Sequence, residues 1–179
     1  MSTVSSAALD DLHRRIGRNL LRFQQIEFAL KFALPYMHPD GGKAGFEALK
    51  KYRERIGSKP LGEVVQALEE SIDIPDGFFS RKLKDVVDAR NAFVHHFFEL
   101  PGIDLMSPTG LAELTRYLDQ QYESAAELFE FARVLSGAAL LAVLDSRPGA
   151  YPELEAMRAT LEASLPEVTW VKDESPSGA

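Results

Sequence analysis

Apolar residues recur at three- and four-residue steps along three long segments of this 179-residue chain, and this spacing constrains the fold most. At about 100° per residue, such spacing places apolar side chains on one face of an α-helix. Prolines and glycines separate the segments, and no alternating apolar and polar run bounded by hairpin turns occurs. The sequence therefore predicts an all-α fold, an antiparallel bundle of four to six helices.

The first helix is expected from about Ser6 to Leu34, with Ser5 or Ser6 as its cap and Pro35 as its end. A second apolar face lies beside the main one, and a helix that is apolar on two sides contacts two neighbours, or one neighbour and a partner subunit. The main stripe consists of Leu9, Leu12, Ile16, Leu20, Phe23, Leu30 and Leu34. The second face consists of Leu21, Phe28 and Phe32.

Clusters of proline and glycine divide the rest of the chain into further helices. Ser107 followed by Pro108 is a typical helix start, and Pro101 disfavours helix at Leu100. The expected helices run from Phe46 to Ile56, from Leu61 to about Ser71, from near Phe78 to Leu100, from Pro108 to Leu144, and from Pro152 to Leu165.

The length corresponds to one domain. We assign residues 1–171 to a single helical domain, with a core at about 6–145 and a C-terminal helical extension at about 152–165, and we expect residues 172–179 to be a disordered tail. No apolar run has membrane-spanning length and the first residues do not resemble a signal peptide, so we expect a cytoplasmic protein without a membrane partner. The absence of cysteine excludes disulfides and thiolate chemistry.

The net charge of −7 argues against a protein that coats nucleic acid non-specifically. The basic residues are nevertheless clustered in one short segment. Within an acidic chain, such a segment leaves room for a small basic site. It comprises Lys50, Lys51, Arg53, Arg55 and Lys59.

Arg90 falls in the middle of the apolar face of the central helix. A charge at such a position is costly unless it is paired. Glu27, the only acid inside the main stripe of the first helix, is the best candidate partner. This pair would hold the guanidinium in a fixed, partly desolvated orientation, which suits a structural ion pair and recognition of phosphate equally.

Asn91, His95 and Asp88 gather on one flank of the same helix, within about 60° of one another. His95 and His96 point about 100° apart, so they cannot chelate one metal ion from a single helix. Neither a cluster of acids and histidines nor a glycine-rich phosphate loop is present. We therefore expect no metal and no cofactor.

The segment RNAFVH at residues 90–95, on the penultimate helix of a small all-α bundle, resembles the HEPN superfamily. Many proteins of that superfamily are ribonucleases or toxins of toxin–antitoxin, abortive-infection and CRISPR-linked systems. The polar residue directly after the arginine, here Asn91, matches as well, and so does a long first helix with a buried acid. The resemblance covers roughly residues 6–145.

The resemblance implies a metal-independent endoribonuclease that acts on RNA and not on DNA. His95 would be the general base on the ribose 2′-OH, which would attack the phosphorus and leave a 2′,3′-cyclic phosphate and a 5′-OH. Arg90 would stabilise the charge on the phosphorane, and Asn91 would orient the arginine or the phosphate. Glu27 and Asp88 would support these residues.

The resemblance also implies a homodimer. Arg90 and His95 are about 140° and 7.5 Å apart on an ideal helix, so we expect them to converge poorly within one chain. In the superfamily, the motif helices of two subunits line a shared cleft. Some of its toxins carry a tyrosine two residues after the histidine, which a nucleotidyltransferase modifies. Phe97 stands there in this chain, so adenylylation at that position is impossible, and an antitoxin that binds directly is the alternative partner.

Two readings compete with the ribonuclease. One is a non-catalytic HEPN-like module for dimerisation or for binding a nucleotide or a partner, and the other is a dimeric bundle with a chance motif. Complete burial of Arg90 by Glu27 would favour the non-catalytic module. A solvent-open cleft that holds Arg90 and His95 from both subunits would favour the enzyme.

Overall fold

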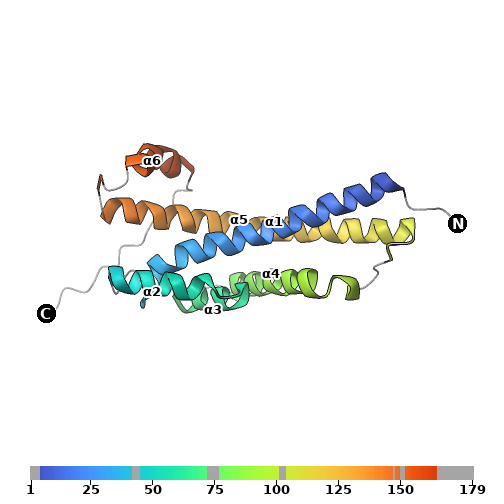
Figure 1. Cartoon of the computed structure of the whole chain (residues 1–179), viewed down its shortest axis with the longest axis horizontal. Helices are drawn as coiled ribbons and strands as arrows, with labels where there is room; N and C mark the ends of the chain where they lie inside the picture. The colour runs from blue at the N-terminus through green and yellow to red at the C-terminus, as the bar shows by residue number, and fades with distance from the viewer. Residues whose placement is uncertain are drawn as a thin grey trace.

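The computed structural model describes residues 5–41, 45–71, 77–100, 104–146, 148–149 and 152–164. Every regular element in these residues is helical, which confirms the all-α bundle (Figure 1). The expected tail lies outside the described residues. The α-helices are α1 (Ser6–Met37), α2 (Phe46–Gly57), α3 (Leu61–Ser71), α4 (Gly77–His95), α5 (Pro108–Ser146) and α6 (Pro152–Ser164).

Helix α1 begins where the sequence predicts, because the side chain of Ser5 accepts a hydrogen bond from the backbone N–H of Ala8 at 3.2 Å. The prediction that Pro35 ends the helix was wrong. Pro35 is buried inside α1, and the N–H of His38 donates to the carbonyl of Leu34 at 3.0 Å to close a further turn. A proline so close to the end removes one helical hydrogen bond without stopping the helix.

Helix α4 ends at His95, earlier than the predicted end at Leu100. The backbone of His96 leaves the helical region, with φ −127° and ψ 24°, and a single 3-10 turn, η2 (Phe97–Glu99), follows. Within this turn the ring of Phe97 packs edge-on against Phe93, with centroids 5.6 Å apart. The chain therefore turns just after the histidine of interest.

The two longest helices, α1 and α5, lie side by side and run in the same direction (Figure 1). The side chain of Asn19, only 1% exposed, donates through Nδ2 to the carbonyl of Leu118 at 3.0 Å. Further along both helices, Ser136 Oγ donates to the carbonyl of Ala29 at 2.9 Å. The predicted antiparallel direction applies to α4, which runs against α1.

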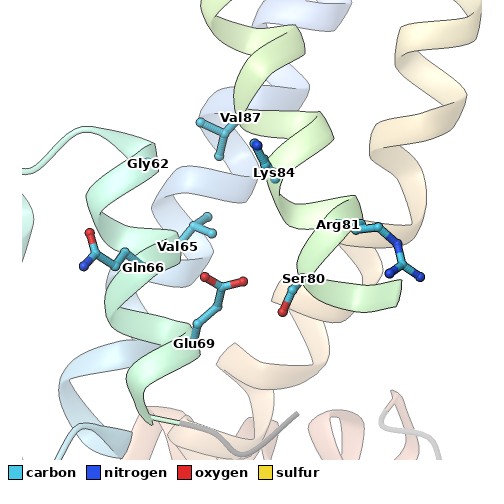
Figure 2. Close-up of a pocket in the computed structure, with 8 residues that line it drawn as sticks. All are labelled: Gly62, Val65, Gln66, Glu69, Ser80, Arg81, Lys84 and Val87. Atoms are coloured by element: carbon cyan, nitrogen blue, oxygen red, sulfur yellow. The ribbon is translucent and has the colours of Figure 1, made fainter. Parts of the chain in front are cut away.

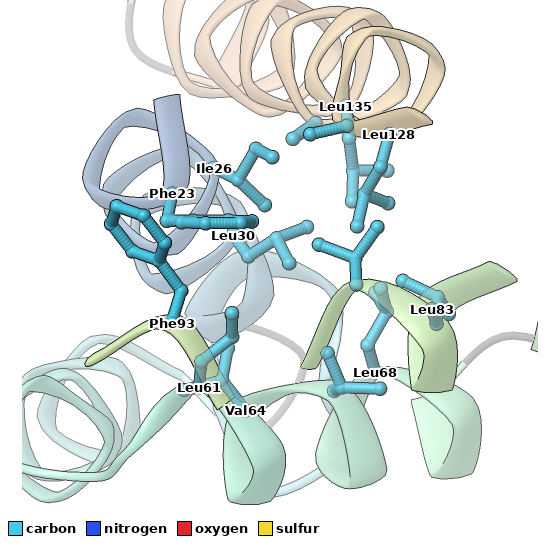
Figure 3. Packing of buried hydrophobic residues seen from close by; sticks show 14 of the residues in the cluster. Phe23, Ile26, Leu30, Leu61, Val64, Leu68, Leu83, Phe93, Leu128 and Leu135 are labelled. Atoms are coloured by element: carbon cyan, nitrogen blue, oxygen red, sulfur yellow. The ribbon is translucent and has the colours of Figure 1, made fainter. Parts of the chain in front are cut away.

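Apolar side chains from the five helices α1 to α5 form one core, part of which is shown in Figure 3. Phe23 on α1 meets Phe93 on α4 with ring centroids 6.1 Å apart, which fixes the two helices against each other near the motif. Leu20, predicted to be in the core, is 38% exposed, because Asn19 takes the buried position instead. Fully buried members include Ile26, Leu30, Leu61, Val64, Leu68, Leu83 and Leu118.

The short helices cover the ends of this bundle. Helix α2 runs against the C-terminal half of α1, with the ring of Tyr52 stacked on His38 at 4.4 Å. Helix α6 is tied to the end of α5 by an ion pair between Arg158 and Asp145 at 2.7 Å. None of the helices in the described ranges is both long enough and apolar enough to cross a membrane.

Candidate functional site

Arg90 sits at the edge of the face that α4 buries. Leu83, Val86 and Phe93 on α4 are buried in the core and hold the helix in place. The side chain of Arg90 is 23% exposed, so its guanidinium lies at the boundary between core and solvent. The following flank is open, since Asn91 and His95 are both exposed.

Four of the five predicted site residues meet at this guanidinium. Arg90 Nη1 donates to Asn91 Oδ1 at 3.1 Å and lies 3.4 Å from His95 Nε2. Arg90 Nη2 lies 4.0 Å from Glu27 Oε2, which confirms the predicted pairing with α1, although at a long distance. The fifth residue, Asp88, is exposed and forms no hydrogen bond or ion pair with any other described residue.

The expectation that Arg90 and His95 converge poorly within one chain was wrong. An offset of about 140° and 7.5 Å separates the two positions on the helix backbone, but the side chains reach across it. The arginine stem is long and flexible enough to run along the helix surface toward its end. His95 is the last residue of α4, so no helical turn follows it on this flank.

The contact between Arg90 and His95 bears on which nitrogen of the imidazole carries the proton. A guanidinium carries only donors, so His95 Nε2 must act as the acceptor at 3.4 Å. With Nε2 as the acceptor of this contact, the ring proton would be on Nδ1 and the ring would be neutral. A general base must have a free lone pair to accept the proton of a hydroxyl group, and a neutral imidazole has one on Nε2.

Glu27 is shared between two cations. Its Oε1 accepts from Lys31 Nζ at 2.7 Å, while its Oε2 faces Arg90 at the longer distance of 4.0 Å. One carboxylate between two cations leaves a net positive charge, which favours an anion at this surface. Lys31 was not predicted to belong to the site. Its position four residues after Glu27 could have indicated this, because that is the usual spacing of an ion pair on a helix.

Lys31 also connects the site to the basic segment on α2. Its Nζ donates to the carbonyl of Gly57, the last residue of α2, at 3.1 Å. Lys50 lies within about 20° of Gly57 around α2 and Arg53 within about 60°, and both are exposed. Two cations of the basic segment therefore lie on the same side of α2 as its last residue, which contacts Lys31.

His96 belongs to a separate contact. It is exposed, as predicted, and its Nδ1 lies 3.1 Å from Glu99 Oε2. Within the described part of the chain, no group of three or more histidine, aspartate or glutamate side chains could hold a metal ion. The cluster of Arg90, Asn91, His95 and Glu27 is thus the best candidate for a functional site among the described residues. No protein-family model matches the chain, and no curated protein or solved structure is significantly similar to it.

Proposed function

We propose that the protein is a metal-independent endoribonuclease of the toxin or defence type, with the fold and motif of the HEPN superfamily. One observation carries the proposal: Arg90 Nη1 lies 3.4 Å from His95 Nε2 on an exposed flank of α4. A phosphate-binding cation and a neutral imidazole side by side are the two groups that cleavage by a ribose 2′-OH requires.

In this mechanism a phosphodiester enters between the guanidinium and the imidazole and takes the place of their mutual contact. His95 Nε2 removes the proton from the 2′-OH, and the 2′-oxygen forms a bond to phosphorus. Arg90 donates to the non-bridging oxygens as negative charge builds up on them. The bond from phosphorus to the 5′-oxygen breaks, and that oxygen takes a proton from water. Asn91 accepts a hydrogen bond from Arg90 at 3.1 Å and so keeps the guanidinium in a fixed orientation.

A second copy of the chain completes the proposed site. Each protomer brings its own Arg90 and His95 together, so the partner need not supply either group. It would instead cover the exposed flank of α4 and exclude water from the reacting phosphate. Leu21 and Phe28 lie on one face of α1 and are 59% and 74% exposed, which makes this face the candidate dimer contact.

Phe97 bears on how such an enzyme would be neutralised. Its ring is half-buried and packs against Phe93, and it carries no hydroxyl to modify. An antitoxin that covers the exposed flank of α4 directly fits this arrangement better than a nucleotidyltransferase acting at this position.

The deciding experiment incubates single-stranded RNA with the protein in excess chelator. We expect cleavage by the wild type and a loss of about 100-fold or more in His95→Ala. His96→Ala is the matched control, because His96 is the exposed neighbouring histidine and contacts Glu99 instead. A substrate with 2′-deoxyribose at the cut site should resist, and its cleavage would show that the nucleophile is a different group.

The alternative function is a non-catalytic HEPN-like module that dimerises or binds a nucleotide or a partner. The observation in its favour is the Glu27 carboxylate, which competes with a phosphate for Arg90. Under this alternative, the wild type would leave RNA intact in the same assay, and His95→Ala would match it.

A further inference from the structure

A second feature lies on the other side of α4, between α3 and α4 (Figure 2). It is a cleft of about 360 Å³, at the small end of the range for ligand sites. Gly62, Val65 and Glu69 line it from α3, and Ser80 and Lys84 line it from α4. Arg90 is not among its lining residues, so the cleft is separate from the candidate site.

The two walls of the cleft carry opposite charges. Glu69 points from α3 toward α4, while Ser80 and Lys84 lie on the side of α4 that faces α3 (Figure 2). Arg81 also lines the cleft from α4, but its guanidinium points away from α3 in the same view. Neither Glu69 nor Lys84 forms an ion pair with any other residue that the structure describes. Both side chains are exposed, so each wall presents a hydrated charge to the cleft.

Between these charges the cleft is apolar. Val65, 6% exposed, and Val87 supply the apolar surface from the two helices. The two walls approach each other at Gly62, where a Cβ would be in van der Waals contact with Val87 Cγ1 at 3.5 Å. A ligand of matching shape is short and aliphatic in its middle, and it is charged at both ends.

We propose that this cleft binds a small aliphatic zwitterion, with its ammonium group at Glu69 and its carboxylate at Lys84 and the Ser80 hydroxyl. The methylene chain would lie over Val65 and Val87 and remove apolar surface from water. A simple anion would leave Glu69 uncompensated and would be repelled by it, and a simple cation would meet the same difficulty at Lys84. A molecule that carries both charges can pair with Glu69 and Lys84 at the same time.

The test titrates 5-aminopentanoate into the full-length protein and follows the methyl signals of Val65 and Val87 by NMR. We expect saturable shifts of these signals, and affinities at least tenfold weaker for pentanoate and for pentylamine. Glu69→Gln and Lys84→Gln should each weaken binding of the zwitterion at least tenfold. Arg81→Gln is the matched control and should bind like the wild type, because it keeps most of the stem that lines the cleft and removes only the guanidinium, which points away from α3.

Two further variants separate binding from folding. Gly62→Leu should abolish the shifts by filling the cleft while every polar group stays in place. The double variant Glu69→Lys with Lys84→Glu reverses both walls and should bind the same zwitterion in the opposite orientation, whereas either single reversal should not. The proposal is overturned if pentanoate binds as tightly as the zwitterion, if Arg81→Gln alone weakens binding, or if the methyl signals do not move.

Discussion

The guanidinium Nη1 of Arg90 lies 3.4 Å from Nε2 of His95, although the two residues are five positions apart on α4. Three of the four groups of the candidate site therefore belong to one helix, and α1 contributes the carboxylate of Glu27. Because these groups come from different helices, their contributions to folding and to chemistry can be separated by substitution.

Glu27→Gln should weaken the fold slightly and strengthen the binding of a phosphodiester. The variant loses the carboxylate that Lys31 and Arg90 share. We expect a loss of about 1 kcal/mol in the free energy of unfolding, because these side chains are partly exposed and screened. Urea denaturation followed by circular dichroism measures the first effect, and anisotropy with a non-cleavable 2′-deoxy oligonucleotide measures the second. Asp88→Asn is the control and should stay within about 0.5 kcal/mol. Weaker oligonucleotide binding by Glu27→Gln would contradict the role given to this carboxylate.

Two glycines in long helices should respond oppositely to alanine. A Cβ on Gly110 would lie 2.4 Å from the carbonyl oxygen of Asp104, a backbone atom, so the loop before α5 must shift. We expect Gly110→Ala to cost about 1–3 kcal/mol. At Gly17 on α1 nothing lies within 4 Å, and Gly17→Ala should gain about 0.5–1 kcal/mol from helix propensity. Thermal unfolding of both variants tests the difference, and equal effects would contradict it.

Stability should fall in acid through carboxylates that are hydrogen-bonded in the folded state. A hydrogen bond from Ser107, followed by one from the N–H of Met106, lowers the pKa of Asp104, and hydrogen bonds from Arg15 and Arg14 lower the pKa of Asp11. A lowered pKa means that the unfolded chain binds more protons, so this stability is present above about pH 4 and is lost as the pH falls through the folded-state values. The midpoint of thermal unfolding between pH 6 and pH 2.5 should show this decline. Asp104→Asn should make the decline shallower, and an unchanged slope would assign the acid sensitivity to other groups.

Self-association should depend on the exposed apolar face of α1. Phe28→Lys places a charge on a side chain that is 74% exposed, and it should convert a dimer to a monomer in sedimentation velocity across a range of concentrations. Met157→Lys alters an apolar side chain on α6 that is 52% exposed, and it should leave the dimer intact. A wild type that stays monomeric at all concentrations would refute the dimer.

Much of the fold was readable from the chain because the relevant signals are local. Apolar spacing located the helices, and serine hydroxyls marked two helix starts, at Ser5 and at Ser107, which accepts from the N–H of Gly110 at 3.1 Å. The failures arose where tertiary contacts override local rules. Burial carries α1 through Pro35, and the aromatic contact of Phe97 accompanies an earlier end to α4.

The candidate site was predictable in its members but not in its geometry. Arg90 and Glu27 are isolated charges, each within an apolar stripe, and each needs a partner. Their pairing could therefore be predicted from the sequence. The distance between Arg90 and His95 could not be inferred from helical angles, since these describe the backbone and not the reach of a long side chain. The cleft between α3 and α4 depends on how two helices are placed in space, which no local pattern encodes.

The buried amide of Asn19 has a consequence for the alignment of α1 and α5. Apolar ridges alone tolerate several offsets between two long helices, each differing by a slide of about 5.4 Å per turn. Any such slide would break the hydrogen bond from Nδ2 of Asn19 to the carbonyl of Leu118 and leave Nδ2 with only the carbonyl of Arg15 on its own helix, at a cost of about 0.5–1.5 kcal/mol. Asn19, together with Ser136 and its hydrogen bond to the carbonyl of Ala29, thus selects a single offset of α5 along α1, the helix that carries Glu27.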